Sequence, residues 1–364
     1  MTVIDADAHV VTRGAESLEL IRSVLERWPE QVSVRTDGVP GLVIEGRGYP
    51  QLDGPGAGCP PGSGLVEGDI SPATPDGMLA DAARDGIDEM VLFPGFGHFA
   101  LSITDEKLAV DVARSYNQWL ADFCARGHGR LHGAAVLPID FPAAAAELAG
   151  ESRALGLVAG VIPPAPRTGN LDSRAFDEVY AAAVDADLPL TVHGGPGVHL
   201  EKPGYDRFTN YIQVHCVSFP FEQMVAMTAL VTGGVFERHP RLRCALLEAG
   251  AGWLPYFVER LHEHWERRGD WIPGGWRRPP AEYVRAGNLY VTCESDERML
   301  PAVIDALGAD CLMFASDYPH WDSAWPESTR ALRERADIDA DAREAILSGN
   351  ARRFYGLPTP ADLG

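Results

Sequence analysis

The sequence predicts a distorted (β/α)₈ barrel, and three observations support this fold class. Eight short apolar runs bounded by turn residues alternate with segments of helical periodicity along the 364 residues. No shift in composition marks a linker in the second half of the chain. Acidic residues and histidines stand where several of the apolar runs end. Because a barrel of this class forms its site where its strands end, these observations agree with one another.

The eight apolar runs are the predicted strands. They cover residues 3–9, 89–93, 131–139, 157–162, 188–193, 242–248, 289–293 and 311–316. Between the second and third runs, apolar residues recur on one helical face at Leu108, Val112, Tyr116, Leu120 and Phe123. A second helix is predicted over 221–231, because Ser218 and Pro220 precede this segment and two glycines follow it.

One segment departs from this alternation. Residues 36–72 are rich in Gly and Pro, which favour turns and irregular loops. Residues 33–35 and 42–45 are predicted to pair as a small hairpin before the irregular loop. We therefore expect a single domain over residues 1–364, with an insertion at about 30–72 that follows the first strand.

Composition narrows the possible partners. The net charge of −21 and the pI near 4.8 argue against binding to nucleic acid or to an anionic membrane. No stretch approaches about 18 consecutive apolar residues, and the segment MTVIDADAHV lacks the basic and apolar parts of a signal peptide. We therefore expect a cytoplasmic protein that acts on a small molecule. The six cysteines include no C-x-x-C pair and are predicted to pack as small apolar side chains.

Three strand ends carry candidate metal ligands. The first strand ends in Asp5-Ala6-Asp7-Ala8-His9, and its two-residue period sends the three ionisable side chains into the barrel. Such burial is costly unless a cation or a network satisfies the charges. The fifth strand ends at His193 and the eighth at Asp317. The donors of Asp7, His9, His193 and Asp317 suit one divalent ion, with Zn²⁺ preferred and Mn²⁺ or Fe²⁺ as alternatives.

Glu248 and His215 are candidate catalytic residues, together with Asp317. Glu248 ends the sixth strand, and three roles stay open for it: an acid or base that acts on substrate, a carboxylate paired with an arginine, and a further metal ligand. His215 lies in the long segment after the fifth strand, from which it can reach the mouth of the barrel.

Substrate contacts are predicted at the loops that follow the strands. Arg207 and Arg298 are candidates for capture of a carboxylate, because a guanidinium donates two parallel hydrogen bonds to it. Phe93, Trp253 and His320 are candidates to hold a planar substrate, and Trp321 is a further possible wall of the pocket.

Five motifs, in their order along the chain, resemble the amidohydrolase superfamily. They are IDADAHV, TVHGGPG, the long segment FPFEQMVAMTALVTGGVFERHPRLRCALLEAGAGW, ASDYPH and GNARRFYGL. The resemblance extends from residue 3 to about residue 357. Within the superfamily, the sequence is similar to the branch that includes aminocarboxymuconate-semialdehyde decarboxylase and resorcylate decarboxylase.

The resemblance implies a barrel with one divalent metal ion. Asp7 takes the place of the residue that precedes the first-strand histidine, His9 that of this histidine, His193 that of the fifth-strand ligand and Asp317 that of the eighth-strand aspartate. Superfamily members with two metals use a carbamylated lysine at the end of the fourth strand, and residues 158–164 contain no lysine. A single ion is therefore expected. The resemblance also suggests a homodimer.

The resemblance favours non-oxidative decarboxylation of an aromatic or unsaturated carboxylic acid. One departure keeps a second enzyme class open, because Glu248 stands where the decarboxylases carry a histidine used for proton transfer. The alternative is hydrolysis of an amide, a lactone or a C–C bond by metal-bound water. A third possibility, from another class, is a barrel that binds a small molecule without turnover.

Overall fold

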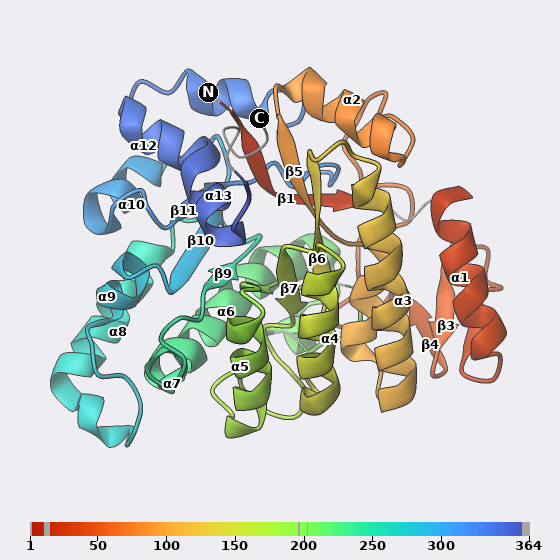
Figure 1. Cartoon of the computed structure of the whole chain (residues 1–364), viewed down its shortest axis with the longest axis horizontal. Helices are drawn as coiled ribbons and strands as arrows, with labels where there is room; N and C mark the ends of the chain where they lie inside the picture. The colour runs from red at the N-terminus through yellow and green to blue at the C-terminus, as the bar shows by residue number, and fades with distance from the viewer. Residues whose placement is uncertain (1, 11–14, 196, 202, 359–364) are drawn as a thin grey trace.

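The computed structural model describes residues 2–10, 15–195, 197–201 and 203–358. Eight parallel strands form one sheet that curves into a barrel, with helices around it (Figure 1). In the order of the sheet, the strands are β1 (Ile4–Val10), β5 (Glu89–Pro94), β6 (Leu131–Val136), β7 (Ala159–Ile162), β8 (Leu190–Val192), β9 (Cys244–Leu246), β10 (Leu289–Cys293) and β11 (Leu312–Phe314). The predicted barrel class is therefore confirmed.

The ring is closed by hydrogen bonds between β1 and the segment that follows β11. The Asp317 N–H donates to the Asp7 carbonyl over 3.0 Å, and the His9 N–H donates to the Tyr318 carbonyl over 2.6 Å. The pairing of β1 with β5 also shifts register between Asp5 and Ala8. These two irregularities distort the barrel at the place where β1 carries its polar residues.

All eight predicted strands are present, but four of them, β6, β8, β9 and β11, end earlier than predicted. His193, Glu248 and Asp317 lie one to three residues beyond β8, β9 and β11, in the turns that follow these strands. The predicted limits were taken from runs of apolar residues. These runs continue beyond the last residue that pairs with a neighbouring strand, because the turns that follow are buried as well.

The helices cover the outside of the barrel. They are α1 (Ala15–Arg27), α2 (Pro75–Asp85), α3 (Glu106–Ala125), α4 (Pro142–Ala154), α5 (Asp177–Asp185), α6 (Tyr211–Thr232), α7 (Val235–Arg238), α8 (Leu254–Arg268), α9 (Pro280–Arg285), α10 (Leu300–Leu307), α11 (Ser328–Arg333), α12 (Ala340–Glu344) and α13 (Asn350–Tyr355). The apolar face predicted from Leu108 to Phe123 belongs to α3 and is fully buried.

The helix predicted over 221–231 begins ten residues earlier, at Tyr211, so its predicted start was wrong. Asn210 caps the true start, because its side chain accepts a hydrogen bond from the Ile212 N–H. Pro220 therefore lies inside α6 and does not open it. By length and composition alone α6 could cross a membrane, but 56% of its most apolar stretch is buried inside the protein, as in a core helix.

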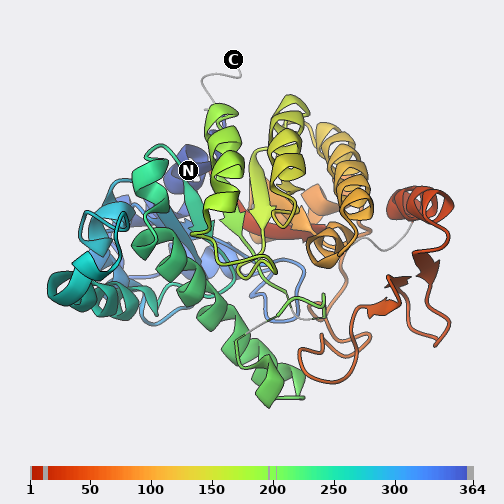
Figure 2. The same ribbon diagram turned by 90° about the horizontal axis from the view of Figure 1, so that it is seen from below.

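The insertion contains a second sheet. The predicted hairpin is confirmed, since β2 (Val32–Val34) and β3 (Leu42–Ile44) pair antiparallel, and a third strand, β4 (Arg47–Tyr49), pairs with β3. Figure 2 shows this sheet apart from the barrel, while the loop after it approaches the N-terminal end of α6. The proposal of one domain over residues 1–364, with an insertion at about 30–72, stays a prediction.

Two barrel loops hold the loop that follows β4. The Gln51 N–H donates to the Gly197 carbonyl over 2.8 Å, and the Val66 N–H donates to the Pro319 carbonyl over 3.0 Å. Gly197 has a φ of +81°, and a Cβ there would lie 3.0 Å from the Cα of Gly58. The backbones approach this closely because both residues are glycines. The insertion is therefore fixed beside the turns that follow β8 and β11.

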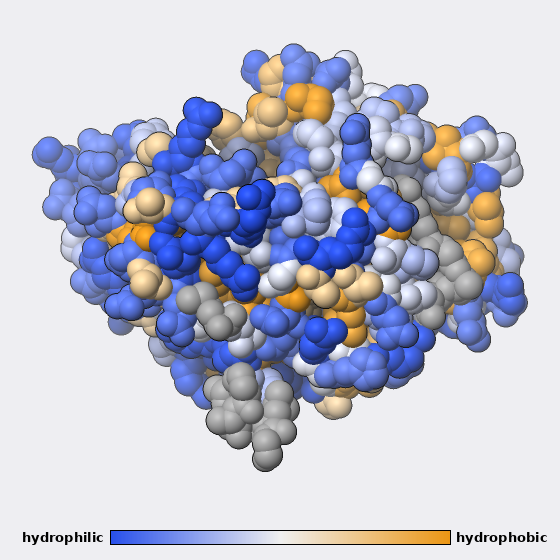
Figure 3. All heavy atoms as spheres, turned by 90° about the horizontal axis from the view of Figure 1, so that it is seen from above, coloured by the Kyte–Doolittle hydropathy of each residue, from blue (hydrophilic) through white to orange (hydrophobic). Residues whose placement is uncertain are grey.

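One face of the molecule is mostly hydrophilic, with small scattered apolar areas (Figure 3). This agrees with the large negative charge of the chain. All six cysteines are free, and Cys124, Cys244, Cys293 and Cys311 are buried, as expected for small apolar side chains.

Candidate metal centre

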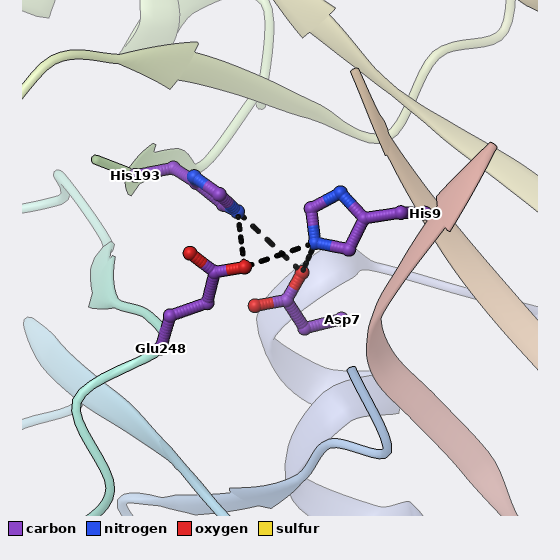
Figure 4. A group of neighbouring side chains, drawn as sticks. All are labelled: Asp7, His9, His193 and Glu248. Carbon is purple, nitrogen blue, oxygen red and sulfur yellow. Dashed lines mark hydrogen bonds and ion pairs between the residues drawn. The ribbon is translucent and has the colours of Figure 1, made fainter. Parts of the chain in front are cut away.

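Four side chains from three strand ends converge inside the barrel (Figure 4). Asp7 and His9 lie on β1, His193 follows β8, and Glu248 follows β9. Each offers one donor atom, and the four donor atoms lie within 4.8 Å of one another. The His9 Nε2 is 3.1 Å from the Glu248 Oε1 and 3.5 Å from the Asp7 Oδ1. The His193 Nε2 is 3.4 Å from the same Glu248 oxygen.

A second group shares His9 and Glu248 with the first and adds Asp317 and His320. The His9 Nε2 is 3.1 Å from the Asp317 Oδ1, and the His320 Nδ1 is 2.7 Å from this oxygen. The imidazole rings of His9 and His320 lie 4.2 Å apart. Three carboxylates and three imidazoles therefore form one polar centre at the mouth of the barrel.

The donor set fits a divalent metal ion. Both carboxylate oxygens of Asp7 and the Nε2 of His193 are buried and have no hydrogen-bond partner among the described residues. Buried polar atoms are costly to leave unpaired, and a cation would satisfy all three. The His193 Nδ1–H donates to the Gly194 carbonyl over 2.6 Å, which holds the ring with Nε2 directed at the cluster. Imidazole and carboxylate donors together suit Zn²⁺, Mn²⁺ or Fe²⁺.

Charge and burial shift the pKa values of the cluster in opposite directions. Burial raises the pKa of Asp7 well above its ordinary value, because His193 offsets only part of the cost. Burial would lower the pKa of His9, but hydrogen bonds with Asp317 and Glu248 raise it to about 10. Burial would raise the pKa of Glu248, but His193 and His9 hold it well below its usual value. Positive charge beside these carboxylates is therefore favourable, and a divalent cation or protonated imidazoles can supply it.

Two of the carboxylates are held by unusual backbone conformations. Glu248 and Asp317 both have a φ of +54°, in the left-handed region that favours glycine. For other residues this conformation costs on the order of 1 kcal/mol and is concentrated at functional sites. Gln223 on α6 supports the same turns, since its Nε2 donates to the Val192 and Leu247 carbonyls, each over 3.0 Å. These carbonyls directly precede His193 and Glu248, so Gln223 positions two members of the cluster.

Asp5 is excluded from the cluster, although period two on β1 predicts that it points the same way as Asp7 and His9. Its carboxylate accepts hydrogen bonds from the Ser316 N–H, the Ser316 hydroxyl and the Asp7 N–H. The shift in register between Asp5 and Ala8 separates it from the other two residues. Burial raises the pKa of Asp5 to about 7, which Ser316 only partly offsets.

The structure does not bring every predicted site residue to the cluster. His215 lies on α6, where its Nε2 is 3.7 Å from the Asp322 Oδ2 and its ring contacts Tyr211 and Trp321. Arg207 and Arg298 are exposed, and among the described contacts none joins either of them to the cluster.

The predicted aromatic residues occupy three different places. Phe93 is fully buried and stacks on His193 at 5.4 Å, so it supports the imidazole from behind. The indole N–H of Trp253 donates to the Gly250 carbonyl over 2.9 Å, and its ring contacts Phe257. Trp321 lines a cavity of about 450 Å³ at the barrel mouth, together with residues of the insertion and of the first turn of α6.

Sequence reasoning missed Gln223 and Tyr211. Gln223 is a polar residue in an otherwise apolar helical stretch, and this pattern could have indicated a buried hydrogen-bonding role. The sequence carries no comparable signal for Tyr211, because its place beside Trp321 depends on the extension of α6 and on the fold of the loop after β11.

The fold and the centre define a (β/α)₈-barrel enzyme whose site can hold a divalent metal ion. The amidohydrolase family model matches residues 4–357. The chain is 27% identical to the gamma-resorcylate decarboxylase of Rhizobium radiobacter over 274 residues, which cover 70% of this chain and 79% of the relative. It is 25% identical to the 2-amino-3-carboxymuconate-6-semialdehyde decarboxylase of Dictyostelium discoideum over 288 residues, or 78% and 77% of the two chains.

Among solved structures, a 5-carboxyvanillate decarboxylase from Novosphingobium aromaticivorans with bound manganese superposes with a TM-score of 0.63. The two chains are 22% identical, and the match covers 79% of this chain and 82% of the other. The chain thus belongs to the amidohydrolase family, as its motifs predict. These relatives are carboxy-lyases, so the family places the chain among metal-dependent enzymes and not among barrels that only bind.

Proposed function

We propose that this protein is a mononuclear metal-dependent carboxy-lyase that removes CO₂ from an aromatic or unsaturated carboxylic acid. The observation that carries the proposal is the buried cluster of Asp7, His9, His193 and Glu248, with unpaired donor atoms, in a family whose relatives include decarboxylases. Cytoplasmic location and a homodimer stay predictions, as does the absence of nucleic-acid and membrane partners.

The ion would be held by Asp7, His9 and His193, with Asp317 as the fourth ligand predicted from the sequence. The distances in the centre add Glu248 to the candidate ligands, because its Oε1 lies between the two imidazoles. We propose one ion, with Zn²⁺ preferred and Mn²⁺ or Fe²⁺ as alternatives. When bound, it supplies positive charge that attracts the substrate carboxylate and stabilises negative charge on neighbouring substrate oxygens.

Asp317 and His320 are positioned to handle the proton. The reaction breaks the bond between the ring carbon and the carboxylate carbon, leaves the electron pair on the ring carbon and releases CO₂, so that carbon must receive one proton. The side chains of Asp317 and His320 are 21% and 37% exposed, whereas those of His9 and His193 are nearly inaccessible. The Asp317 Oδ1 accepts a hydrogen bond from the His320 Nδ1–H and can pass a proton to substrate.

The remaining predicted residues take supporting places in this proposal. His215, with Asp322, lies at the rim of the barrel and is proposed to contact substrate there. Phe93 fixes the ring of His193, and Trp253 packs beside the turn that carries Glu248. Arg207 and Arg298 are less well placed to capture the carboxylate than the metal site is, because both are exposed.

Metal analysis and an assay of CO₂ release test the proposal. Purified protein should contain about one transition-metal ion per chain, and it should release CO₂ from at least one member of a panel of hydroxybenzoates and dienoic acids. Removal of the ion with a chelator should abolish release, and addition of Zn²⁺ or Mn²⁺ should restore it. A protein that neither contains nor takes up a divalent ion would contradict the proposal.

Hydrolysis is the second candidate, and one observation favours it. Glu248 stands where the resemblance to the decarboxylases expects a proton-transferring histidine. It lies within 3.4 Å of both imidazoles, where a carboxylate can accept a proton from a nucleophilic water. The test is to assay the metal-loaded protein with lactones, amides and the acid panel. Hydrolysis without release of CO₂ from any acid would support this second candidate.

A further inference from the structure

The cavity of about 450 Å³ at the barrel mouth has no role in the proposed decarboxylation of a small acid. Its walls come from three segments: the loop after β4 supplies Leu52 and Cys59, the start of α6 supplies Tyr211 and Ile212, and the loop after β11 supplies Trp321. Pockets that enclose drug-sized ligands have roughly 300–1,000 Å³. The volume is therefore sufficient for a sizeable organic group.

The cavity lies next to the metal cluster. Trp321 directly follows His320, whose ring lies 4.2 Å from that of His9. The Trp321 indole also contacts the His215 ring at 5.7 Å and the Tyr211 ring at 6.4 Å. None of the six cluster residues lines the cavity, so a ligand that occupies both places must extend past Trp321.

Three polar side chains of the cavity wall, Tyr211, Asn210 and Ser63, form hydrogen bonds within the wall. The Tyr211 hydroxyl accepts a hydrogen bond from the Trp321 indole N–H over 3.1 Å. The Asn210 side chain caps α6, and the Ser63 hydroxyl donates to the Pro60 carbonyl over 2.9 Å. The remaining surface that a ligand meets is mainly aromatic and aliphatic. Such walls favour an apolar group through burial of its surface.

The charges around the cavity disfavour an anionic group. None of the cavity's lining residues is a lysine or an arginine. Asp322 lies beside the cavity, next to Trp321 in the chain and 3.7 Å from the His215 Nε2. The chain as a whole carries a net charge of −21. A second carboxylate on the substrate would therefore enter the cavity without a partner and against a negative field.

We propose that this cavity binds the part of the substrate that is remote from its carboxylate, and that this part is an uncharged aryl or alkyl extension. The inference rests on the proposed function, because it places the carboxylate at the metal cluster. It narrows the substrate class to acids with a single anionic end and an apolar tail, as opposed to dicarboxylates or unsubstituted hydroxybenzoates.

Calorimetric titration of the metal-loaded enzyme tests the proposal. The probes are 2-hydroxybenzoate, its 4-butyl and 5-butyl derivatives, and its 4-carboxy and 5-carboxy derivatives. All five share the carboxylate and hydroxyl head, so they differ only in the group that would enter the cavity. At least one butyl derivative should bind about tenfold or more tightly than the parent acid, and both carboxy derivatives should bind more weakly. Equal affinities for all five would overturn the proposal.

A charge placed in the cavity wall sharpens the test. Ile212 lines the cavity and is 49% exposed, so Ile212→Arg is expected to fold. This substitution should remove the gain from the butyl group and raise the affinity for a carboxy derivative about tenfold. Thr209→Arg, on the same wall, should act in the same direction. Leu155→Arg, at the exposed C-terminal end of α4, is the matched control and should leave all five affinities unchanged.

The two proposals fail in distinguishable ways. Tight binding of a butyl derivative without CO₂ release from any probe would refute decarboxylation and support the cavity assignment. Release of CO₂ from the parent acid, with no gain in affinity from a butyl group, would support decarboxylation and overturn the cavity assignment.

Discussion

The metal cluster and the cavity beside it differ in how the fold builds them. The cluster is carried by β1 and by the turns directly after β8, β9 and β11, and its side chains are mostly buried. The cavity is walled by the insertion, the first turn of α6 and the loop after β11, and Ile212 and Trp321 are partly exposed there. The barrel frame therefore fixes the chemical centre, whereas loops outside the frame shape the space for substrate.

This difference predicts two kinds of mutational effect. Changes in the cluster should reduce turnover of every substrate, because all substrates need the same centre. Changes in the cavity should alter the ranking of substrates and leave the chemical step intact. Three predictions test the cluster side of the comparison.

The largest effect is expected for Asp317→Asn. Asparagine tolerates the left-handed backbone at this position and has nearly the same shape, but it cannot carry the proton. We expect kcat/KM to fall by at least about 10³-fold for every substrate, measured as CO₂ release by the metal-loaded enzyme. Asp310→Asn, at the exposed opposite end of β11, is the matched control and should keep the activity of the unaltered enzyme. Full turnover by Asp317→Asn would remove Asp317 from the mechanism.

The sequence predicts the cluster better than it predicts the cavity, and the reason is physical. Strand ends of a barrel meet at one rim, so residues such as His193 and Asp317 can be placed together once the strands are counted. The role of Glu248 stayed open because residue type alone does not distinguish a ligand from a proton carrier. The cavity depends on contacts such as those between Gln51 and Gly197, which join distant segments and leave no local pattern in the sequence.

The start of α6 and the third strand of the insertion were not predicted correctly, and both lie outside the barrel strands. Pro220 is an ordinary signal for a first helical turn, but α6 already starts at Tyr211, where Asn210 caps it. The third strand of the insertion, Arg47–Tyr49, contains Arg and Gly before its one apolar residue, so it shows no apolar run. Local signals therefore locate the strands of the frame but not the elements that surround the cavity.

The second prediction concerns Asp5, which lies next to the cluster and is fully buried. Its pKa rises from 3.8 to about 7 on folding, so the folded protein binds this proton more tightly than the unfolded chain does. The contribution of Asp5 to the free energy of unfolding is therefore largest below pH 3.8. This contribution falls as the pH rises to about 7, by on the order of 4 kcal/mol in total.

Asp5→Asn should remove this loss, because the amide cannot ionise and can still pair with Ser316. The measurement is the urea midpoint of chelator-treated protein between pH 4.5 and 8. The difference between Asp5→Asn and the unaltered protein should grow with pH, while the exposed variant Asp310→Asn should run parallel to the unaltered protein. Parallel curves for Asp5→Asn would show that Asp5 does not titrate in this range.

The smallest effect is expected at Gln223, which touches no proposed ligand and acts through the backbone. Its Nε2 bridges the carbonyls that precede His193 and Glu248, and Gln223→Met removes both donors while keeping an unbranched side chain. Partners of this kind typically contribute about 10- to 100-fold to metal affinity. We expect a loss in that range, measured by competition with a chelator, and a changed visible absorption spectrum of the Co²⁺-loaded protein.

The spectrum separates a positioning role from a purely structural one. A residue that only stabilises the fold would lower the melting temperature without changing how the Co²⁺ ligands are arranged. Gln118→Met, on the exposed side of α3, is the matched control and should change neither the spectrum nor the metal affinity. An unchanged spectrum and affinity in Gln223→Met would show that the turns after β8 and β9 keep their geometry without α6. In that case the barrel strands and their turns alone would position the cluster. The geometry of the cluster would then not depend on α6, although Gln223 contacts both turns.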